Sequence, residues 1–177
     1  MNALQKLNLM RQTGGSRRTV GLADATIERF LKTDPLLTQA IDEGFAAFEA
    51  ARAEFPQLIG LDENAQLREI QAGFVNFYAE DAVNPYVAVS GRGPWVVTLK
   101  GAVVHDDGGY GMLGAGHGPQ AVIDAMARPQ VMANIMTPSL SHLRLDQALR
   151  REIGHTRGGC PYTRFLCLNS GSESVTL

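Results

Sequence analysis

The stretch Cys167-Leu168-Asn169-Ser170-Gly171-Ser172-Glu173-Ser174 places a glycine between two serines directly after an apolar run. This run, residues 164–168, has the composition of a buried strand, and the Ser and Glu residues that follow are typical of the first turn of a helix. The stretch therefore predicts a strand, a glycine turn and a new helix, which together are half of a βαβ unit. Because a parallel strand needs a crossover and a neighbouring strand before it is buried, we expect the other half after Leu177.

The turn itself has the features of an anion site. The first N–H groups of a helix have no partner inside the helix, and the helix dipole is positive there. Gly171 would let a ligand approach the backbone closely, and Ser170 and Ser172 offer hydroxyl donors. A phosphate group fits this description. The simpler alternative is a plain N-cap, in which Ser170 or Ser172 only caps the next helix.

A second glycine-rich segment, residues 109–114, fits the dinucleotide-binding pattern G-x-G-x-x-G literally. Its context does not fit, because its first glycine lies in a turn after Asp106-Asp107, and Gly116 and Gly118-Pro119 interrupt the helix that should begin there. No acidic residue stands about twenty residues later, where a ribose ligand is needed. We therefore do not expect a dinucleotide.

Nearer the N-terminus the patterning is helical, and it changes near Asn84-Pro85 to glycine and β-branched residues. Asp34-Pro35 is a helix start, because aspartate caps and proline is tolerated at the first helical position, and Phe55-Pro56 is the stop. A second helix is expected over residues 63–80. The apolar faces of the two helices consist of Leu37, Ile41, Phe45 and Phe48, and of Leu67, Ile70, Phe74, Phe77 and Tyr78. Residues 1–83 are thus interpreted as a helical N-terminal extension.

After this point strands and helices alternate, which predicts an α/β fold. Predicted strands cover residues 95–99, 102–105 and 164–168, and predicted helices cover residues 120–127 and 140–153. Lys100-Gly101 joins the first two strands, and we expect Lys100 to be a solvated turn lysine. Residues 84–177 are interpreted as the start of one larger, incomplete domain.

Composition excludes several classes of function. The 177 residues carry 16 Lys and Arg against 18 Asp and Glu, a formal net charge of −2, so nothing favours nucleic acid. No apolar run is long enough for a membrane span. Cys160 and Cys167 match neither a zinc nor a disulfide spacing, so we expect buried free thiols in a cytoplasmic protein.

Histidines and paired aspartates give no metal or acid–base site. His105, His117, His142 and His155 are not spaced as ligands, so no metal is expected. His117 is interpreted as a turn histidine bonded to backbone. Asp106-Asp107 is interpreted as a solvated turn, because adjacent side chains point apart.

Three segments in order resemble the class III aminotransferases, enzymes of fold type I that depend on pyridoxal 5'-phosphate. Residues 169–173 resemble their N-S-G-[ST]-E segment, and Val104 to Gly109 stands where that family has a strand and an acidic glycine turn. Residues 113–119 resemble its L-G-H-x-H-P segment, although Gly116-His117-Gly118 replaces the usual second histidine. The resemblance covers about residues 84–177 and implies the N-terminal part of a fold-type I transferase.

The resemblance also implies roles for residues and partners. The family residues at the positions of Gly171 and Ser172 bind the cofactor phosphate, and Ser170 and Glu173 lie beside that site. Residues 111–118 would form one wall of the substrate entrance. The implied substrates are a small amino donor and a keto acid or aldehyde acceptor, and the implied assembly is a homodimer.

The family's catalytic groups are missing from this chain. Its Schiff-base lysine, pyridine-nitrogen acid and stacking aromatic all follow the phosphate loop, whereas Lys6, Lys32 and Lys100 all precede it. We therefore expect no catalytic residue here and no transamination by these 177 residues alone. A racemase or aminomutase of the same family, or a non-catalytic binding or assembly module derived from it, are the alternatives.

Overall fold

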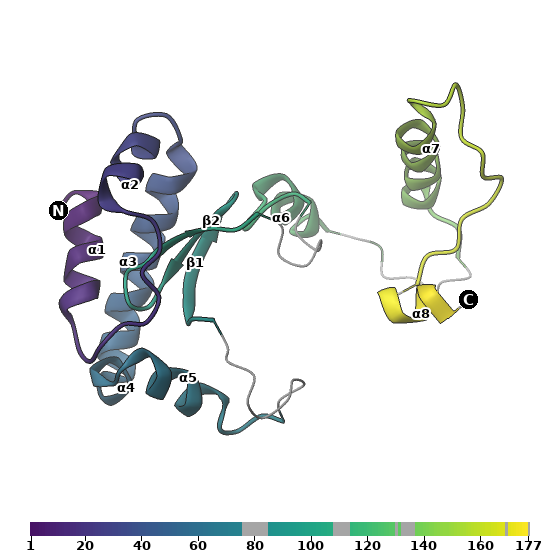
Figure 1. Ribbon diagram of the computed structural model, residues 1–177. Helices are drawn as coiled ribbons and strands as arrows, with labels where there is room; N and C mark the ends of the chain where they lie inside the picture. The colour runs from purple at the N-terminus through teal and green to yellow at the C-terminus, as the bar shows by residue number, and fades with distance from the viewer. Residues whose placement is uncertain (76–84, 108–113, 130, 132–136, 169, 177) are drawn as a thin grey trace. The chain divides into compact units, whose positions relative to one another are not determined.

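The computed structural model divides into two units, Met1–Arg128 and Pro129–Leu177, which are considered separately (Figure 1). It describes residues 1–75, 85–107, 114–129, 131, 137–168 and 170–176. The first unit contains helices α1 (Ala3–Gln12), α2 (Asp24–Leu31), α3 (Pro35–Glu54), α4 (Pro56–Gly60), α5 (Glu63–Gln71) and α6 (Gln120–Met126), and strands β1 (Ala88–Arg92), β2 (Trp95–Thr98) and β3 (Val103–His105). The second unit contains α7 (Leu140–Gly154) and α8 (Gly171–Thr176).

Helix α3 begins and ends where its sequence predicts. Asp34 Oδ1 accepts a hydrogen bond from the Leu36 backbone N–H at 2.9 Å, and Pro35 takes the first helical position. The helix stops before Pro56, whose ring cannot continue it. The predicted face is confirmed for Leu37, Ile41 and Phe48, which are buried, and Phe45 packs against them half-buried.

The sheet is antiparallel, with the strand order β1-β2-β3. The predicted strands at residues 95–99 and 102–105 are confirmed as β2 and β3, while β1 has no counterpart among the predicted strands. Gly101 turns the chain between β2 and β3 with a φ of +68°, and a Cβ at this position would lie 2.6 Å from the Leu7 carbonyl oxygen. The fold is therefore mixed α/β, with one small antiparallel sheet in the described residues.

Helix α3 packs on β1 and β2, and α1 packs on α3 (Figure 1). Gly44 allows the close approach, because a Cβ there would lie 2.7 Å from Ser90 Oγ and 3.0 Å from Val97 Cγ1. Most of the buried apolar residues form one cluster, which consists of Leu7, Met10, Ile27, Leu37, Ala40, Ile41, Phe48, Ile59, Trp95, Val97, Leu99 and Val103. Trp95 anchors it, since its indole N–H donates to Asp34 Oδ2 at 2.7 Å.

Helix α5 differs from its prediction. It ends at Gln71 instead of continuing to residue 80, of which residues 76–80 lie outside the described part. Leu67 is buried, but Ile70 and Phe74 are 42% and 80% exposed, so the predicted apolar face is wrong at these two positions. Besides Leu67, the helix buries Glu63 and Gln66, whose side chains bond to neighbouring backbone. Phe77 and Tyr78 lie outside the described residues.

Helix α7 of the second unit confirms its prediction. Ser139 Oγ accepts from the His142 N–H at 3.4 Å and caps it. Arg150 donates to the Tyr162 and Thr163 carbonyl oxygens at 3.1 and 2.9 Å, which ties the following chain to the helix. Among the described residues of this unit, only Gly154 is buried.

The predicted buried strand at residues 164–168 is wrong. This segment belongs to no strand, and Leu166 is 74% exposed. A strand needs a neighbour for its backbone hydrogen bonds, and the described residues of the second unit offer none. Cys160 and Cys167 are free as expected, but the predicted burial is wrong, because Cys167 is exposed and Cys160 is only half-buried.

Among the described residues no helix is both long and apolar enough to cross a membrane.

Candidate functional site

The predicted phosphate turn forms the start of α8, and Ser170 is its cap. Ser170 Oγ accepts from the Glu173 N–H at 3.2 Å, and the Ser170 carbonyl accepts from the Ser174 N–H at 3.2 Å. Ser170 therefore caps the helix, as the N-cap interpretation predicts, and phosphate binding at this turn stays a prediction. Asn169 lies outside the described residues.

Capping by Ser170 leaves Gly171 and Ser172 available. Their N–H groups precede the first hydrogen bond of α8 and so have no partner within the helix. Both residues are exposed, and a Cβ on Gly171 would meet nothing within 4 Å. Two backbone amides and the Ser172 hydroxyl are donors suited to an oxyanion such as a phosphate. Glu173 lies in the first turn of α8, where its negative charge interacts favourably with the positive end of the helix dipole.

The segment of residues 114–119 lies in the first unit, against the turn between β1 and β2. The His117 backbone pairs with that of Gly93 in both directions, at 2.8 and 2.9 Å. Arg92 Nη1 donates to the Gly118 carbonyl at 2.9 Å, while its Nε and Nη2 donate to the Glu43 carboxylate. This bidentate pairing lowers the pKa of Glu43. Of the predicted wall of the substrate entrance, residues 114–118 thus form a loop held by hydrogen bonds to Gly93 and Arg92. Residues 111–113 lie outside the described part.

Asp106 and Asp107 each face a histidine. His117 Nε2 lies 3.0 Å from Asp106 Oδ2, and His105 Nδ1 lies 2.5 Å from Asp107 Oδ1. The expectation that the His117 ring bonds to backbone is thus wrong, because the ring pairs with the Asp106 carboxylate. The expectation of a solvated turn is confirmed for Asp107, whose side chain is 87% exposed, but it is wrong for Asp106, whose side chain is only 22% exposed. Burial, with the nearby Asp106 charge, raises the pKa of Tyr86.

Lys100 is the largest departure from the sequence predictions. The hairpin pattern predicts a lysine in solvent, yet Lys100 is only 2% exposed. Its ammonium donates to the Leu61 carbonyl at 2.6 Å and lies 3.2 to 3.5 Å from those of Gly15, Ile59 and Thr13. Burial lowers the pKa of Lys100, and the charges of Glu63 and Asp62 oppose this effect.

Glu63 and Gln66, which sequence reasoning missed, lie in the same region. Glu63 Oε2 accepts from the backbone N–H groups of Arg18 and Thr19 at 2.5 and 2.6 Å. Gln66 Nε2 donates to the Leu58 carbonyl at 3.0 Å. One signal could have indicated burial of Lys100: it is the sole charge in an otherwise apolar hairpin, residues 95–104.

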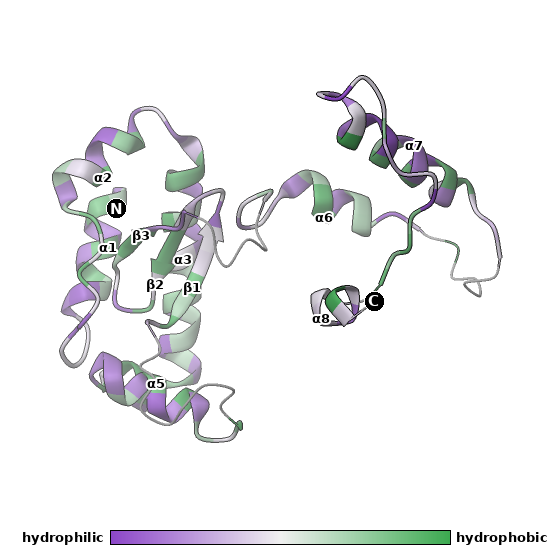
Figure 2. Ribbon diagram, turned by 45° about the vertical axis from the view of Figure 1, so that its right-hand side comes forward, coloured by the Kyte–Doolittle hydropathy of each residue, from purple (hydrophilic) through white to green (hydrophobic). Residues whose placement is uncertain are grey.

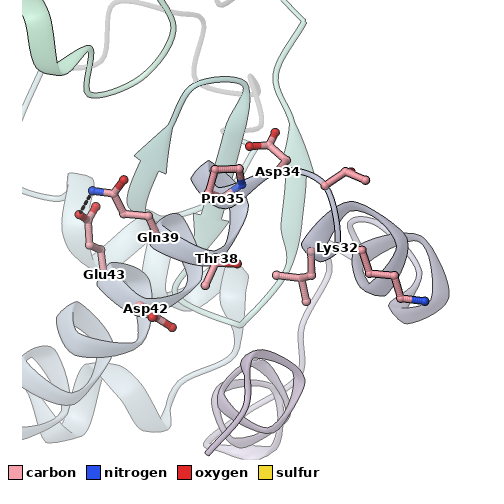
Figure 3. A pocket seen from close by; sticks show the side chains of 9 residues that line it. Lys32, Asp34, Pro35, Thr38, Gln39, Asp42 and Glu43 are labelled. Atoms are coloured by element: carbon pink, nitrogen blue, oxygen red, sulfur yellow. Dashed lines mark hydrogen bonds between the residues drawn. The ribbon is translucent and has the colours of Figure 1, made fainter.

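A surface hollow of about 520 Å³ lies between the end of α2 and the first turns of α3 (Figure 3). Three carboxylates line it, but each already has a partner. Asp34 accepts from Trp95 and Leu36, Asp42 pairs with Lys6 at 2.7 Å, and Glu43 pairs with Arg92 and accepts from Gln39. The hollow therefore offers no free carboxylate for a cation.

A second hollow of about 910 Å³ lies against α4 and α5. Phe55, Leu61 and Ile70 give it an apolar surface, with Glu54 and Glu69 also lining it. It holds no cluster of catalytic side chains. Likewise, within the part of the chain that the structure describes, no three His, Cys, Asp or Glu side chains are grouped as metal ligands would be.

Comparisons with protein-family models, with curated proteins and with solved structures found no match to this chain.

Proposed function

We propose that this chain is the N-terminal part of a class III aminotransferase of fold type I, and that it contributes to the phosphate site for pyridoxal 5'-phosphate. One observation carries the proposal: in the N-S-G-S-E segment, Ser170 takes the cap of α8, and the first amides of the helix, at Gly171 and Ser172, stay available. The three resembling segments in the right order support it.

In this proposal the chain's own residues hold the phosphate. The Gly171 and Ser172 N–H groups and the Ser172 hydroxyl donate to its oxygens, and the missing side chain of Gly171 leaves room for the phosphate to approach the backbone. Ser170 orders the turn through its bond to the Glu173 N–H. The bound cofactor would supply the electron sink for amino-group transfer.

The lysine of the reaction comes from elsewhere in this proposal. The Lys100 ammonium is buried among carbonyl oxygens, and the Lys6 ammonium pairs with Asp42 at 2.7 Å. Lys32 is exposed, but it precedes the phosphate turn, whereas the resemblance implies a reactive lysine that follows it. We therefore propose that the reactive lysine lies in another part of the polypeptide or in another chain, and that the assembled enzyme is a cytoplasmic homodimer acting on an amino donor and a keto acid or aldehyde.

Two alternatives stay open. A racemase or aminomutase of the same family would use the same turn, and would differ by needing no keto acceptor. A non-catalytic binding or assembly module is favoured by a different observation: the first unit has its own buried core around Trp95 and Phe48, with none of the proposed cofactor contacts in it.

The first test is the intact mass of the natural polypeptide, compared with 19.1 kDa for this chain. A much larger mass supports the aminotransferase proposal, and an equal mass contradicts it unless a partner chain supplies the lysine. Consumption of a keto acceptor by the natural protein then separates a transferase from a racemase.

The phosphate role is tested by binding of pyridoxal 5'-phosphate and of pyridoxal, which lacks the phosphate, to the natural protein. Ser172→Ala should weaken binding of the phosphorylated form by roughly 10-fold or more, the size of a hydrogen bond to a charged group. Binding of pyridoxal should not change. Ser174→Ala, two residues on in α8, is the matched control. An equal loss for both ligands, or the same loss in the control, would contradict the assignment.

A further inference from the structure

The carbonyl oxygens around Lys100 come from two chain segments that are far apart in sequence. Thr13 is the C-cap of α1 and Gly15 follows it, while Ile59 and Leu61 are at the C-terminal end of α4. Carbonyls at a helix C-terminus lack helical partners and carry the negative end of the dipole. Two such ends facing the same ammonium therefore offset part of the cost of burying its positive charge.

Two more buried oxygens lie in this region. Glu63 Oε1 and Gln66 Oε1 are buried without a hydrogen-bond partner among the described residues. Gln66 is held against the end of α4 by its bond to the Leu58 carbonyl, and the Glu63 charge acts on Lys100. The four carbonyl oxygens around the Lys100 ammonium already outnumber its three N–H groups. Backbone carbonyl oxygens gathered around one point are also the groups that replace the hydration shell of a bound monovalent cation.

We propose that these carbonyls form a binding site for a small monovalent cation of the primary-ammonium class, and that the Lys100 side chain is its built-in occupant. Lys100 is in this view a positioning residue: its ammonium joins the chain after α1 to the junction of α4 and α5, across 85 to 87 and 39 to 41 residues of sequence. When the Lys100 side chain is shortened, a free alkylammonium ion of the size of the removed atoms should bind to the same oxygens.

The experiment uses Lys100→Ala in the full 177-residue chain and n-propylammonium chloride, which replaces the atoms that the substitution removes. The melting temperature is followed by circular dichroism, and tetramethylammonium chloride at equal ionic strength controls for the general effect of salt. The variant should melt below the wild type. Propylammonium at ten times its Kd should raise its melting temperature by roughly 3–6 °C more than tetramethylammonium does.

Lys100→Met is the matched control, because its side chain fills the space of the lysine stem but brings no charge. In this variant and in the wild type, propylammonium should have no larger effect on the melting temperature than tetramethylammonium. An equal rise with both salts in Lys100→Ala, or an equal response of Lys100→Met, would overturn the proposal.

A measurement on the wild type keeps the proposal testable if Lys100→Ala does not fold. In ¹⁵N-labelled protein near neutral pH, buried and hydrogen-bonded Nζ protons should exchange slowly enough to give a separate lysine signal. Lys6, whose side chain is 22% exposed, serves as the internal comparison. Loss of any distinct signal for Lys100, with exchange as fast as for Lys6, would show that no such site exists.

Discussion

The two units differ in how far they bury their apolar residues, although both contain apolar sequence. Apolar residues occur on α3 and β2 of the first unit and also on α7 and the chain before α8 in the second (Figure 2). In the first, Trp95, Phe48 and Val97 are at most 1% exposed. In the second, Leu140, Leu143 and Leu166 are each more than half exposed. Apolar composition therefore predicts which residues are able to form a core, whereas burial depends on which partners fold against them.

The largest test of this difference compares Phe48→Ala with Leu166→Ala. Phe48 is buried between α3 and the rest of the core, so its truncation should lower the free energy of unfolding by about 3–5 kcal/mol through lost contacts and a cavity. Leu166→Ala should change it by less than about 0.5 kcal/mol. Denaturant unfolding followed by far-UV circular dichroism measures both. Equal losses would show that residues 164–168 are packed in solution.

Glycine positions make a second comparison, within the first unit. Gly44→Ala puts a Cβ within 2.7 Å of Ser90 Oγ and should cost about 1–3 kcal/mol by pushing α3 away from the sheet. Gly60→Ala has nothing within 4 Å and should be neutral or stabilise by up to about 1 kcal/mol. The same unfolding measurement decides. A harmless Gly44→Ala would mean that α3 does not lie against β1 and β2.

Local sequence signals correctly predicted those elements whose stabilising partners are close by in the sequence. Asp34-Pro35 indicated the start of α3, and the hairpin at Lys100-Gly101 indicated β2 and β3, because the partner strand follows after a short turn. The segment 164–168 failed for the opposite reason. It has the composition of a strand, but its partner would have to come from a distant part of the chain.

The candidate sites divide in the same way. The cap by Ser170 depends only on the next three residues, so a local pattern was enough to predict it. The surroundings of Lys100 depend on Gly15 and Leu61, which no local pattern relates to a hairpin turn. A turn lysine is normally solvated, and here two helix ends cover it.

The pH dependence of stability sharpens this point. The pKa of Lys100 is lowered, so the folded protein releases this proton more readily than the unfolded chain, whose lysine pKa is about 10.4. Between the folded pKa and the unfolded value the unfolded state binds more protons, so the contribution of Lys100 to stability rises with pH and is lost again as pH falls through the folded pKa. In paired unfolding measurements, the stability of the wild type relative to Lys100→Met should therefore increase as the pH is raised from 7 towards the unfolded-state pKa of about 10.4. A constant difference would mean that burial does not perturb the lysine.

The smallest expected effect compares two helix caps, one in each unit. Asn2 Oδ1 accepts from the Gln5 N–H at 2.9 Å and caps α1, which buries Leu7 and Met10 in the core. Asn2→Ala should therefore cost about 1 kcal/mol of global stability. Ser170 makes the equivalent bond in α8, but no residue of α8 is buried, so the helix is not coupled to a core. Ser170→Ala should change global stability by less than about 0.5 kcal/mol and only reduce local helix content, seen in backbone chemical shifts of residues 171–176. A global loss equal to that of Asn2→Ala would show that α8 packs against a surface in solution. The contrast between a packed first unit and an exposed second unit would then not extend to α8.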